Sequence, residues 1–175
     1  MRDILIVVDM QKDFIDGALG TKEAIAIVPA VVDKVRTFEG EVLFTRDTHF
    51  DNYMDTQEGR NLPVPHCIRG SEGWKICKEL QPFTQKARII DKATFGSMEL
   101  GPILQALHEE EAISSITFVG LCTDICVISN VMIAKAFLPE VPVIVDAACC
   151  AGVTPDSHNT ALASMRTCQV QVENA

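Results

Sequence analysis

Apolar residues in this chain form short continuous runs, separated by segments with helical periodicity. Runs of strand length occupy residues 4–8, 41–45, 87–90, 115–119, 142–145 and 168–172. Between them, apolar side chains recur every three or four residues in the segments 23–38, 97–108, 123–137 and 155–165. Strands that are apolar at nearly every position are typical of a parallel sheet covered on both faces. The pattern predicts an α/β fold: a single doubly wound, Rossmann-like domain over residues 1–175, with a six-stranded, mostly parallel sheet flanked by helices.

Proline and capping residues refine the expected helix boundaries. Pro29 is expected in the first turn of its helix, with the residues before it irregular, because proline loses no hydrogen bond there. A short helix is expected after Gly73, ending before Pro82. Thr123 or Asp124 is expected to cap the helix after the fourth strand, since their side-chain oxygens accept hydrogen bonds from first-turn N–H groups.

Composition and charge exclude several classes of protein. The 175 residues carry a net charge of −9 and no basic cluster, so neither nucleic acid nor an anionic membrane is an expected partner. The sequence contains no uninterrupted apolar run of about 18 residues, so no membrane span is expected. The apolar run at the start of the chain ends in Asp9 and has no signal-peptide cleavage site, so we interpret it as a strand. The seven cysteines are odd in number and form no C-x-x-C pair, which favours a reduced, cytoplasmic protein.

Polar side chains follow four of the expected strands, at the edge where doubly wound sheets bind ligands. Asp9 follows the first strand, Asp47 and His49 the second, Lys92 the third, and Cys126 the turn after the fourth. Each has an ordinary alternative: a salt bridge or cap for Asp9, a solvated charge for Lys92, an inert buried thiol for Cys126. The combination predicts a functional site, because one edge of the sheet receives an acid, an acid–imidazole pair, a lysine and a thiol.

Cys126 is a candidate nucleophile. It lies near the first turn of the expected helix, where the partial positive charge and free N–H groups lower the pKa of a thiol and can hold an oxyanion. No histidine is obviously placed as its base. Asp9 could accept the thiol proton if burial raised its pKa, and the Lys92 ammonium would stabilise both the thiolate and the oxyanion.

Asp47, His49 and His66 form a candidate metal site. Residues two apart on an extended segment point to the same side, so Asp47 and His49 can bind one ion, and His66 would come from the long polar loop that follows. Two imidazoles and one carboxylate leave coordination positions open, as in catalytic metal sites. The same loop holds two alternative acidic ligands, Asp51 and Asp55. His158, after the fifth strand, could lie near the site but is not assigned to it.

Four blocks of the sequence resemble the isochorismatase-like cysteine hydrolases, and among these the nicotinamidases. The blocks are a D-x-Q-x-D-F opening at 9–14, a metal block at 45–49 with 65–67, a lysine block at 92–97 and a nucleophile block at 120–127. The resemblance extends from residue 4 to about residue 172, and so covers nearly the whole chain.

The resemblance implies a catalytic arrangement. Cys126 would be the nucleophile, Asp9 the general base, and Lys92 the group that positions and stabilises them. The peptide bond between Leu121 and Cys122 would be cis, turning the Cys122 N–H, with that of Cys126, toward the oxyanion.

The resemblance also implies a metal, a substrate and an assembly. Asp47, His49 and His66 would hold a divalent ion, with zinc expected and manganese or iron as alternatives, and Phe14 and Leu121 would contact the substrate. The reaction would be hydrolysis of a small amide, nicotinamide to nicotinic acid and ammonia, through a cysteine thioester. Family members commonly form dimers or tetramers, so a homo-oligomer is expected.

Three departures from the nicotinamidase pattern keep alternatives open. The loop after His49 has Asp51 and Asp55 where some nicotinamidases have an additional histidine. Pro63 stands where many nicotinamidases have an aromatic residue, and Cys122 replaces a small residue that is usually alanine. A related enzyme acting on a ureido or carbamoyl amide is the main alternative. An isochorismatase-type hydrolase is less expected, because those enzymes typically lack the nucleophilic cysteine. The last alternative is an inactive binding member of the fold, against which the complete acid–lysine–cysteine set argues.

Overall fold

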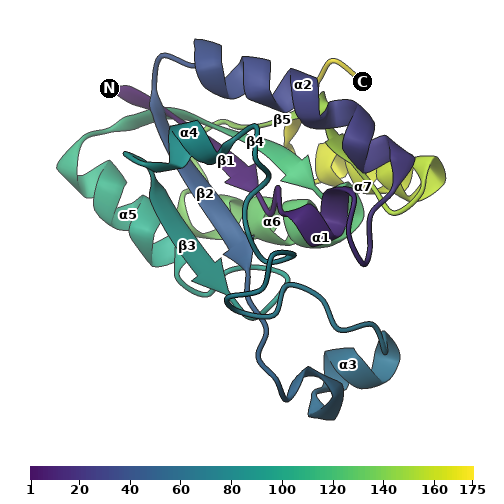
Figure 1. Ribbon diagram of the computed structural model, residues 1–175. Coiled ribbons are helices and arrows are strands. Elements are labelled where there is room, and N and C mark those ends of the chain that lie inside the picture. The colour runs from purple at the N-terminus through teal and green to yellow at the C-terminus, as the bar shows by residue number, and fades with distance from the viewer.

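The computed structural model describes residues 1–175 as a parallel β-sheet between two layers of helices (Figure 1). The strands run in the order β3-β2-β1-β4-β5-β6, and each neighbouring pair is parallel, which confirms the predicted doubly wound α/β fold. The strands are β1 (Arg2–Val8), β2 (Glu41–Asp47), β3 (Arg88–Lys92), β4 (Ile113–Leu121), β5 (Val143–Ala151) and β6 (Gln171–Glu173). The helices are α1 (Lys12–Ile15), α2 (Lys22–Thr37), α3 (Gln57–Asn61), α4 (Gln81–Thr84), α5 (Leu100–Glu110), α6 (Ile128–Phe137) and α7 (Pro155–Thr167), with a 3₁₀ turn η1 (Tyr53–Asp55) and a π-helical turn η2 (Thr123–Val127).

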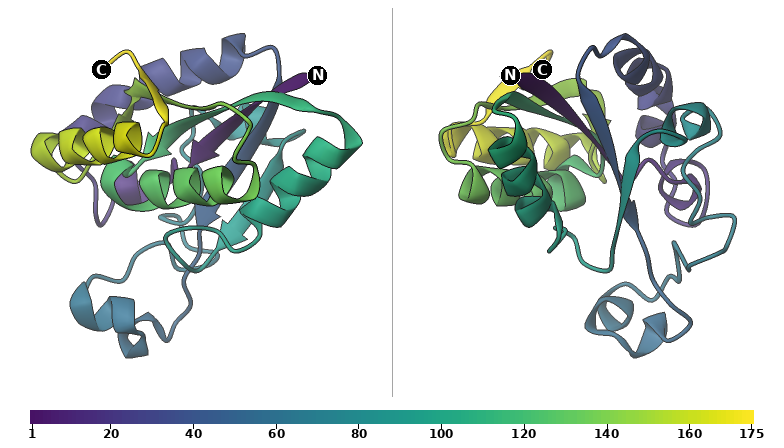
Figure 2. Two further views of the ribbon diagram at one scale, coloured as in Figure 1. Left: turned by 180° about the vertical axis from the view of Figure 1, so that it is seen from behind. Right: turned by 90° about the vertical axis from the view of Figure 1, so that its left-hand side faces the viewer.

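The two faces of the sheet are covered by different helices (Figure 2). Leu5 and Val7 of β1 pack in a core cluster with α2, whereas Ile4, Ile6 and Val8 pack in a second cluster with α5, α6 and α7. All five side chains are fully buried, which explains why the strand is continuously apolar from Ile4 to Val8. No helix has the length and hydropathy needed to cross a membrane.

The structure corrects two of the expected helix boundaries. Pro29 lies inside α2 and not in its first turn, because the helix already begins at Lys22 and is capped by Thr21, whose hydroxyl accepts a hydrogen bond from the Ala24 N–H. Apolar side chains before and after the proline are buried against the sheet, and this packing outweighs the lost hydrogen bond. The short helix expected to end before Pro82 instead contains this residue in its first turn, where proline is tolerated.

The two central strands define the place where a ligand can bind. β1 and β4 are neighbours, and the chain continues from them toward opposite edges of the sheet, so a crevice is expected beyond their carboxyl ends. Asp9 follows β1, and the turn that carries Cys126 follows β4. Gly120 lets the two strands approach closely: its φ is +117°, and a Cβ there would lie 2.1 Å from the Val8 carbonyl oxygen.

A lobe formed by residues 50–65 projects beyond the end of β2 (Figure 1). It contains η1 and α3, and the side chain of Tyr53 is buried within it, with 1% exposure. Gly59 of α3 packs directly on η1, since a Cβ there would lie 2.0 Å from the Tyr53 carbonyl oxygen. The lobe therefore holds its shape through contacts within itself.

Candidate active site

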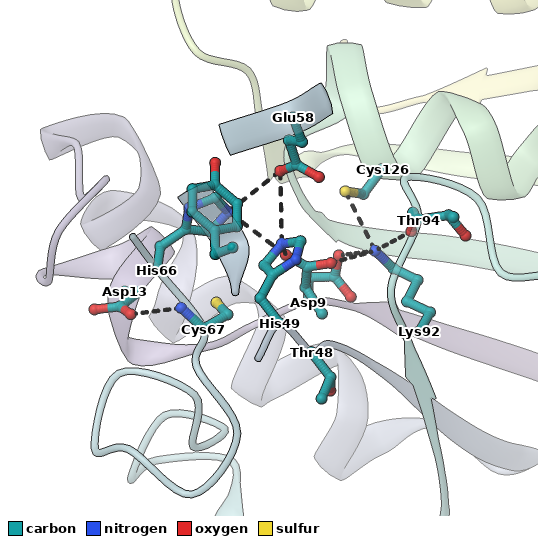
Figure 3. Close-up of polar contacts among 12 residues, drawn as sticks. Asp9, Asp13, Thr48, His49, Glu58, His66, Cys67, Lys92, Thr94 and Cys126 are labelled. Carbon is teal, nitrogen blue, oxygen red and sulfur yellow. Dashed lines mark hydrogen bonds and ion pairs between the residues drawn. The ribbon is translucent and has the colours of Figure 1, made fainter. Parts of the chain in front are cut away.

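Lys92 lies at the centre of the site, at the end of β3 (Figure 3). Its Nζ is 2.7 Å from Asp9 Oδ2 and 3.4 Å from Asp47 Oδ1, and donates to Cys126 Sγ at 3.4 Å and to the Thr94 carbonyl oxygen at 3.0 Å. The side chain is 1% exposed. Burial alone would lower the pKa of this ammonium, but the nearby Asp9, Cys126 and Asp47 raise it by a larger amount. The net shift is upward, so Lys92 is charged.

Asp9 is fully buried, directly after β1. Its Oδ1 accepts a hydrogen bond from the Thr45 hydroxyl at 2.7 Å, and its φ is +47°, in the left-handed region that few residues other than glycine adopt. Burial raises the pKa of this carboxyl, as the proposed role of a base requires, and Lys92 opposes that shift. Asp9 is thus a carboxyl of increased basicity, tied to the same ammonium as the thiol.

Cys126 lies in η2, with 5% exposure. Burial raises the pKa of its thiol well above the ordinary value, Asp9 adds to the shift, and Lys92 opposes it. The expected lowering of this pKa at a helix N-terminus is therefore wrong, because desolvation and the neighbouring carboxyl outweigh the helix and the lysine. The thiol is protonated in this arrangement and needs a base before it can attack a substrate.

The turn that precedes Cys126 has an unusual backbone. The Leu121–Cys122 peptide bond is cis, as the resemblance implied. The Val127 N–H donates to the Cys122 carbonyl oxygen at 3.0 Å, so the turn is wider than an α-helical one. The Cys122 N–H makes no hydrogen bond within the chain, and is free to bind an oxygen atom.

The capping role expected of Thr123 or Asp124 is wrong, because no side chain caps η2. The Asp124 side chain turns instead toward the segment between β5 and α7, and the Thr123 side chain turns toward the first turns of α7. The Thr123 hydroxyl lies 2.7 Å from His158 Nδ1, and Asp124 Oδ1 accepts a hydrogen bond from the Val153 N–H at 3.1 Å. His158, left unassigned by the sequence, thus contacts the turn that carries the candidate nucleophile.

Asp47, His49 and His66 come together beside Lys92. Figure 3 shows the two histidines at this place. One ligand atom from each lies within 4.8 Å of the others, and all three residues are buried. The alternative ligands Asp51 and Asp55 are exposed and lie outside this group. Burial alone would raise the pKa of Asp47, but the neighbouring imidazoles of His49 and His66 and the charge of Lys92 lower it, so Asp47 is an anion.

The nitrogen atoms of this group fit a metal ion. His66 Nδ1 lies 2.8 Å from the Val64 carbonyl oxygen, and donating this hydrogen bond leaves Nε2 unprotonated and aimed at Asp47. His49 Nε2 is buried and makes no hydrogen bond, although Asp47 Oδ2 lies 2.9 Å away. An orphaned ring nitrogen beside a carboxylate and a second imidazole is the donor set expected of a zinc, manganese or iron site.

Glu58 is a functional candidate that the sequence reasoning missed. Its Oε1 lies 3.5 Å from the Nε2 atoms of both His49 and His66. It is carried by α3, which Thr56 caps by accepting a hydrogen bond from the Gly59 N–H at 3.0 Å. The cap was a readable signal for the helix, but nothing in the sequence indicated that this helix folds over the two histidines.

Gln11 was also missed as a supporting residue. Its Nε2 donates to the Asp47 carbonyl oxygen at 2.8 Å and to the Trp74 carbonyl oxygen at 2.9 Å, and its Oε1 accepts from the Asp47 N–H at 2.7 Å. The side chain is fully buried. It fixes the backbone of the acidic ligand, and its position inside the D-x-Q-x-D-F block was the signal for it.

The two expected substrate contacts differ in their surroundings. The ring of Phe14 is partly exposed, with its centroid 5.5 Å from that of His66. Leu121 is 1% exposed and packs in the core cluster on the α2 face. Phe14 borders the group of histidines, and the substrate role of Leu121 stays a prediction.

Comparisons with known proteins identify the family. The isochorismatase domain matches residues 3–175. The nicotinamidase/pyrazinamidase of Mycobacterium tuberculosis is 28% identical over 181 residues, which cover 96% of each protein. The pyrazinamidase of Pyrococcus horikoshii in complex with zinc superposes with a TM-score of 0.84 at 27% identity, covering 98% of each chain. The N-carbamoylsarcosine amidase of Thermoplasma acidophilum gives 0.78 at 25% identity, covering 98% of this chain and 95% of that one. With a family match along almost its entire length, the chain belongs to the isochorismatase family.

Proposed function

We propose that the protein is an amidohydrolase that converts nicotinamide to nicotinic acid and ammonia. The observation that carries this proposal is the position of Lys92, whose ammonium contacts both a buried carboxyl and a buried thiol beside a group of metal-ligand type. Relatives named nicotinamidase/pyrazinamidase support the substrate class.

The proposed reaction begins with transfer of the Cys126 thiol proton to Asp9. Burial raises the pKa of the acceptor and so favours the transfer. It also raises the pKa of the thiol, which opposes the transfer and keeps the sulfur protonated before the substrate binds. The thiolate then attacks the carbonyl carbon of the amide, and the C=O π electrons move to oxygen. The Lys92 ammonium stabilises the negative charge that passes from the carboxyl to the sulfur and the oxygen.

The reaction then proceeds in two stages, formation of the thioester and its hydrolysis. The N–H groups of Cys122 and Cys126 bind the oxyanion, and Asp9 returns its proton to the departing nitrogen, so that ammonia leaves and a thioester remains. Asp9 next removes a proton from water, which attacks the thioester carbon. The C–S bond of the second tetrahedral intermediate then breaks, and Asp9 returns its proton to the departing sulfur, so the acid is released and the thiol is restored.

The metal site and the ring contact are also part of the proposal. Asp47, His49 and His66 would hold a divalent ion, with zinc first and manganese or iron as alternatives, and Glu58 lies close enough to complete the site. When bound, the ion would supply a Lewis acid for the pyridine nitrogen. Phe14 borders the same space and would pack against the ring.

A ureido or carbamoyl amide is the second candidate substrate. The similarity in fold to an N-carbamoylsarcosine amidase supports it, as does Pro63 at a position where an aromatic residue would flank a ring. Both substrate classes need the same nucleophile and base, and differ only in what surrounds the amide.

An ammonia-release assay tests the proposal. Nicotinamide, pyrazinamide, a ureido acid and a carbamoyl amine are compared, each with and without added zinc or manganese. We expect fastest release from nicotinamide, and loss of at least about 10³-fold in Cys126→Ala. The exposed Cys168 supplies a matched control, Cys168→Ala, which keeps full activity. Faster release from the ureido or carbamoyl compound would favour the second candidate, and no release from any amide would overturn both.

Metal content, assembly and location complete the proposal. We expect about one divalent ion per chain by elemental analysis, and none in a variant that lacks both histidine ligands. A dimer or tetramer is expected by light scattering, and the cytoplasm by cell fractionation.

A further inference from the structure

Thr123 is a buried hydroxyl within the turn that carries the nucleophile. It is fully buried, between the cis Leu121–Cys122 peptide bond and Cys126. Its hydroxyl has one hydrogen-bond partner in the whole chain, Nδ1 of His158, at 2.7 Å. The amidase mechanism uses neither side chain, so this contact requires a separate explanation.

The segment that carries His158 is itself held firmly. α7 begins with a capping box, in which the Thr154 hydroxyl accepts from the Ser157 N–H and the Ser157 hydroxyl caps the Thr154 N–H. Gly152 packs against His158, because a Cβ there would lie 2.8 Å from the His158 nitrogen and 2.9 Å from its Cα. The imidazole therefore projects from a rigid base.

A second contact joins the same two segments. Asp124 Oδ1 accepts the hydrogen bond from the Val153 N–H at 3.1 Å. Two consecutive side chains of the turn, Thr123 and Asp124, are thus attached to the residues that follow β5, and neither caps its own helix. These two contacts with His158 and Val153 therefore help to fix the orientation of the turn.

We propose that His158 is a positioning residue for the oxyanion-binding turn. By holding Thr123 in place, it would direct the neighbouring Cys122 N–H, which no hydrogen bond within the chain orients, toward the oxygen of the tetrahedral intermediate. This inference rests on the proposed amidase function. His158 itself touches neither the substrate nor the thiol.

The inference predicts a specific kinetic pattern. The oxyanion exists only after attack on the bound amide, so a misdirected N–H group weakens the transition state and leaves substrate binding intact. Removing an oxyanion donor outright costs about 10²–10³-fold in rate, and displacing one should cost less. We therefore expect kcat to fall about 30-fold in His158→Leu, with KM changed less than about twofold.

Paired variants separate positioning from bulk and from stability. In His158→Asn the amide lies close to the position of Nδ1, so kcat should remain within about threefold of the parent. Thr123→Val removes the hydroxyl and should match His158→Leu, whereas Thr123→Ser should be nearly normal. The double variant Thr123→Val/His158→Leu should lose no more than the worse single variant, because both break one interaction. A normal kcat in His158→Leu, or multiplied losses in the double variant, would overturn the inference.

Hydrogen exchange tests the positioning without catalysis. The Ile125 and Val127 N–H groups both bind the Cys122 carbonyl oxygen, so their exchange reports how firmly the turn is held. In His158→Leu these two amides should exchange at least tenfold faster than in the parent and in His158→Asn, with the midpoint of thermal unfolding similar in all three proteins. If the parent hydrolyses no amide, the proposed function fails. Independently of that result, unchanged exchange of the Ile125 and Val127 amides in His158→Leu would overturn the role of His158. If His158→Leu does not fold, Thr123→Val provides both measurements.

Discussion

The proposed catalytic trio (Asp9, Lys92 and Cys126) and the proposed metal group (Asp47, His49, His66 and Glu58) are neighbours, but they are built differently. Asp9 and Lys92 each directly follow or end a strand, and Cys126 lies in the turn after β4, so the parallel ladder fixes their relative positions. In the metal group only Asp47 belongs to a strand, and Glu58 and His66 come from the lobe and its end. The positions of the trio are therefore fixed by the sheet. The positions of Glu58 and His66 are fixed by the fold of the lobe.

The lobe has little apolar packing to hold it. Phe50, Met54 and Leu62 are 51%, 46% and 39% exposed, and Tyr53 is its one large buried side chain. The Tyr53 hydroxyl donates to the Leu62 carbonyl oxygen at 2.8 Å, and its ring lies edge-on to those of His49 and His66, with centroids 4.9 and 5.1 Å away. A change in the lobe should therefore disturb the metal group and spare the trio.

The largest effect should come from the trio. Asp9→Asn keeps the shape of the side chain, and asparagine tolerates the left-handed backbone at this position. It cannot accept the thiol proton, so kcat/KM should fall about 10²–10⁴-fold while metal content and the unfolding midpoint stay close to normal. Steady-state kinetics with elemental analysis check this. Normal turnover would remove Asp9 from the mechanism, and loss of metal would show that the two groups are not independent.

A smaller effect should follow from a change in the lobe. In Gly59→Ala the new Cβ meets the Tyr53 carbonyl oxygen, so α3 must shift and carry Glu58 away from the histidines. Metal affinity should fall about 10- to 100-fold by chelator competition, as for other groups that support a metal site.

The exposed Asn61, at the end of the same helix, provides a control for this variant. Asn61→Ala adds no clash and should bind metal normally. The rate of Cys126 alkylation by iodoacetamide should stay within about twofold in both variants. A parallel loss of thiol reactivity in Gly59→Ala would contradict the separation of the two groups.

The same contrast explains what the sequence could predict. Apolar runs indicated the strands, and in a doubly wound sheet the strand ends meet, so the pattern of the sequence was enough to expect Asp9, Lys92 and Cys126 at one edge. Their assigned roles, and those of the metal ligands, stay predictions. Glu58 was not predicted, because its position depends on how the lobe folds, and the pattern of apolar residues does not determine that fold. The pKa of Cys126 was misjudged because burial is a property of the assembled site and not of one helix end.

An effect of similar size, on stability, should follow from a residue that ties Cys126 to the segment after Lys92. Asn130 is fully buried, and its Nδ2 donates to the carbonyl oxygens of Cys126 at 2.8 Å and Phe95 at 3.2 Å, while its Oδ1 accepts from the Ser97 N–H at 2.9 Å. Asn130→Ala leaves these groups unpaired and should cost about 2–3 kcal/mol in the free energy of unfolding. Urea unfolding measures this cost. Ser129→Ala, one position earlier and partly exposed, should cost less, and equal costs would contradict the assignment.

The smallest effect should come from an ion pair remote from both groups. Asp146 Oδ2 lies 2.8 Å from Lys34 Nζ, and although burial raises the pKa of this carboxyl, hydrogen bonds from Lys34 and Asn174 lower it below 3.8. A lowered folded-state pKa stabilises the protein above the unfolded value, and this contribution is lost as the pH falls through the folded value. Asp146→Asn should therefore cost about 1–2 kcal/mol near neutral pH and progressively less below pH 3.8. The exposed pair of Arg36 with Asp33 supplies the control, because Asp33→Asn should change stability little at any pH. Urea unfolding from about pH 7 to about pH 3 distinguishes Asp146→Asn from Asp33→Asn. If the cost of Asp146→Asn did not depend on pH, the shape of the side chain and not its charge would make this contact stabilising.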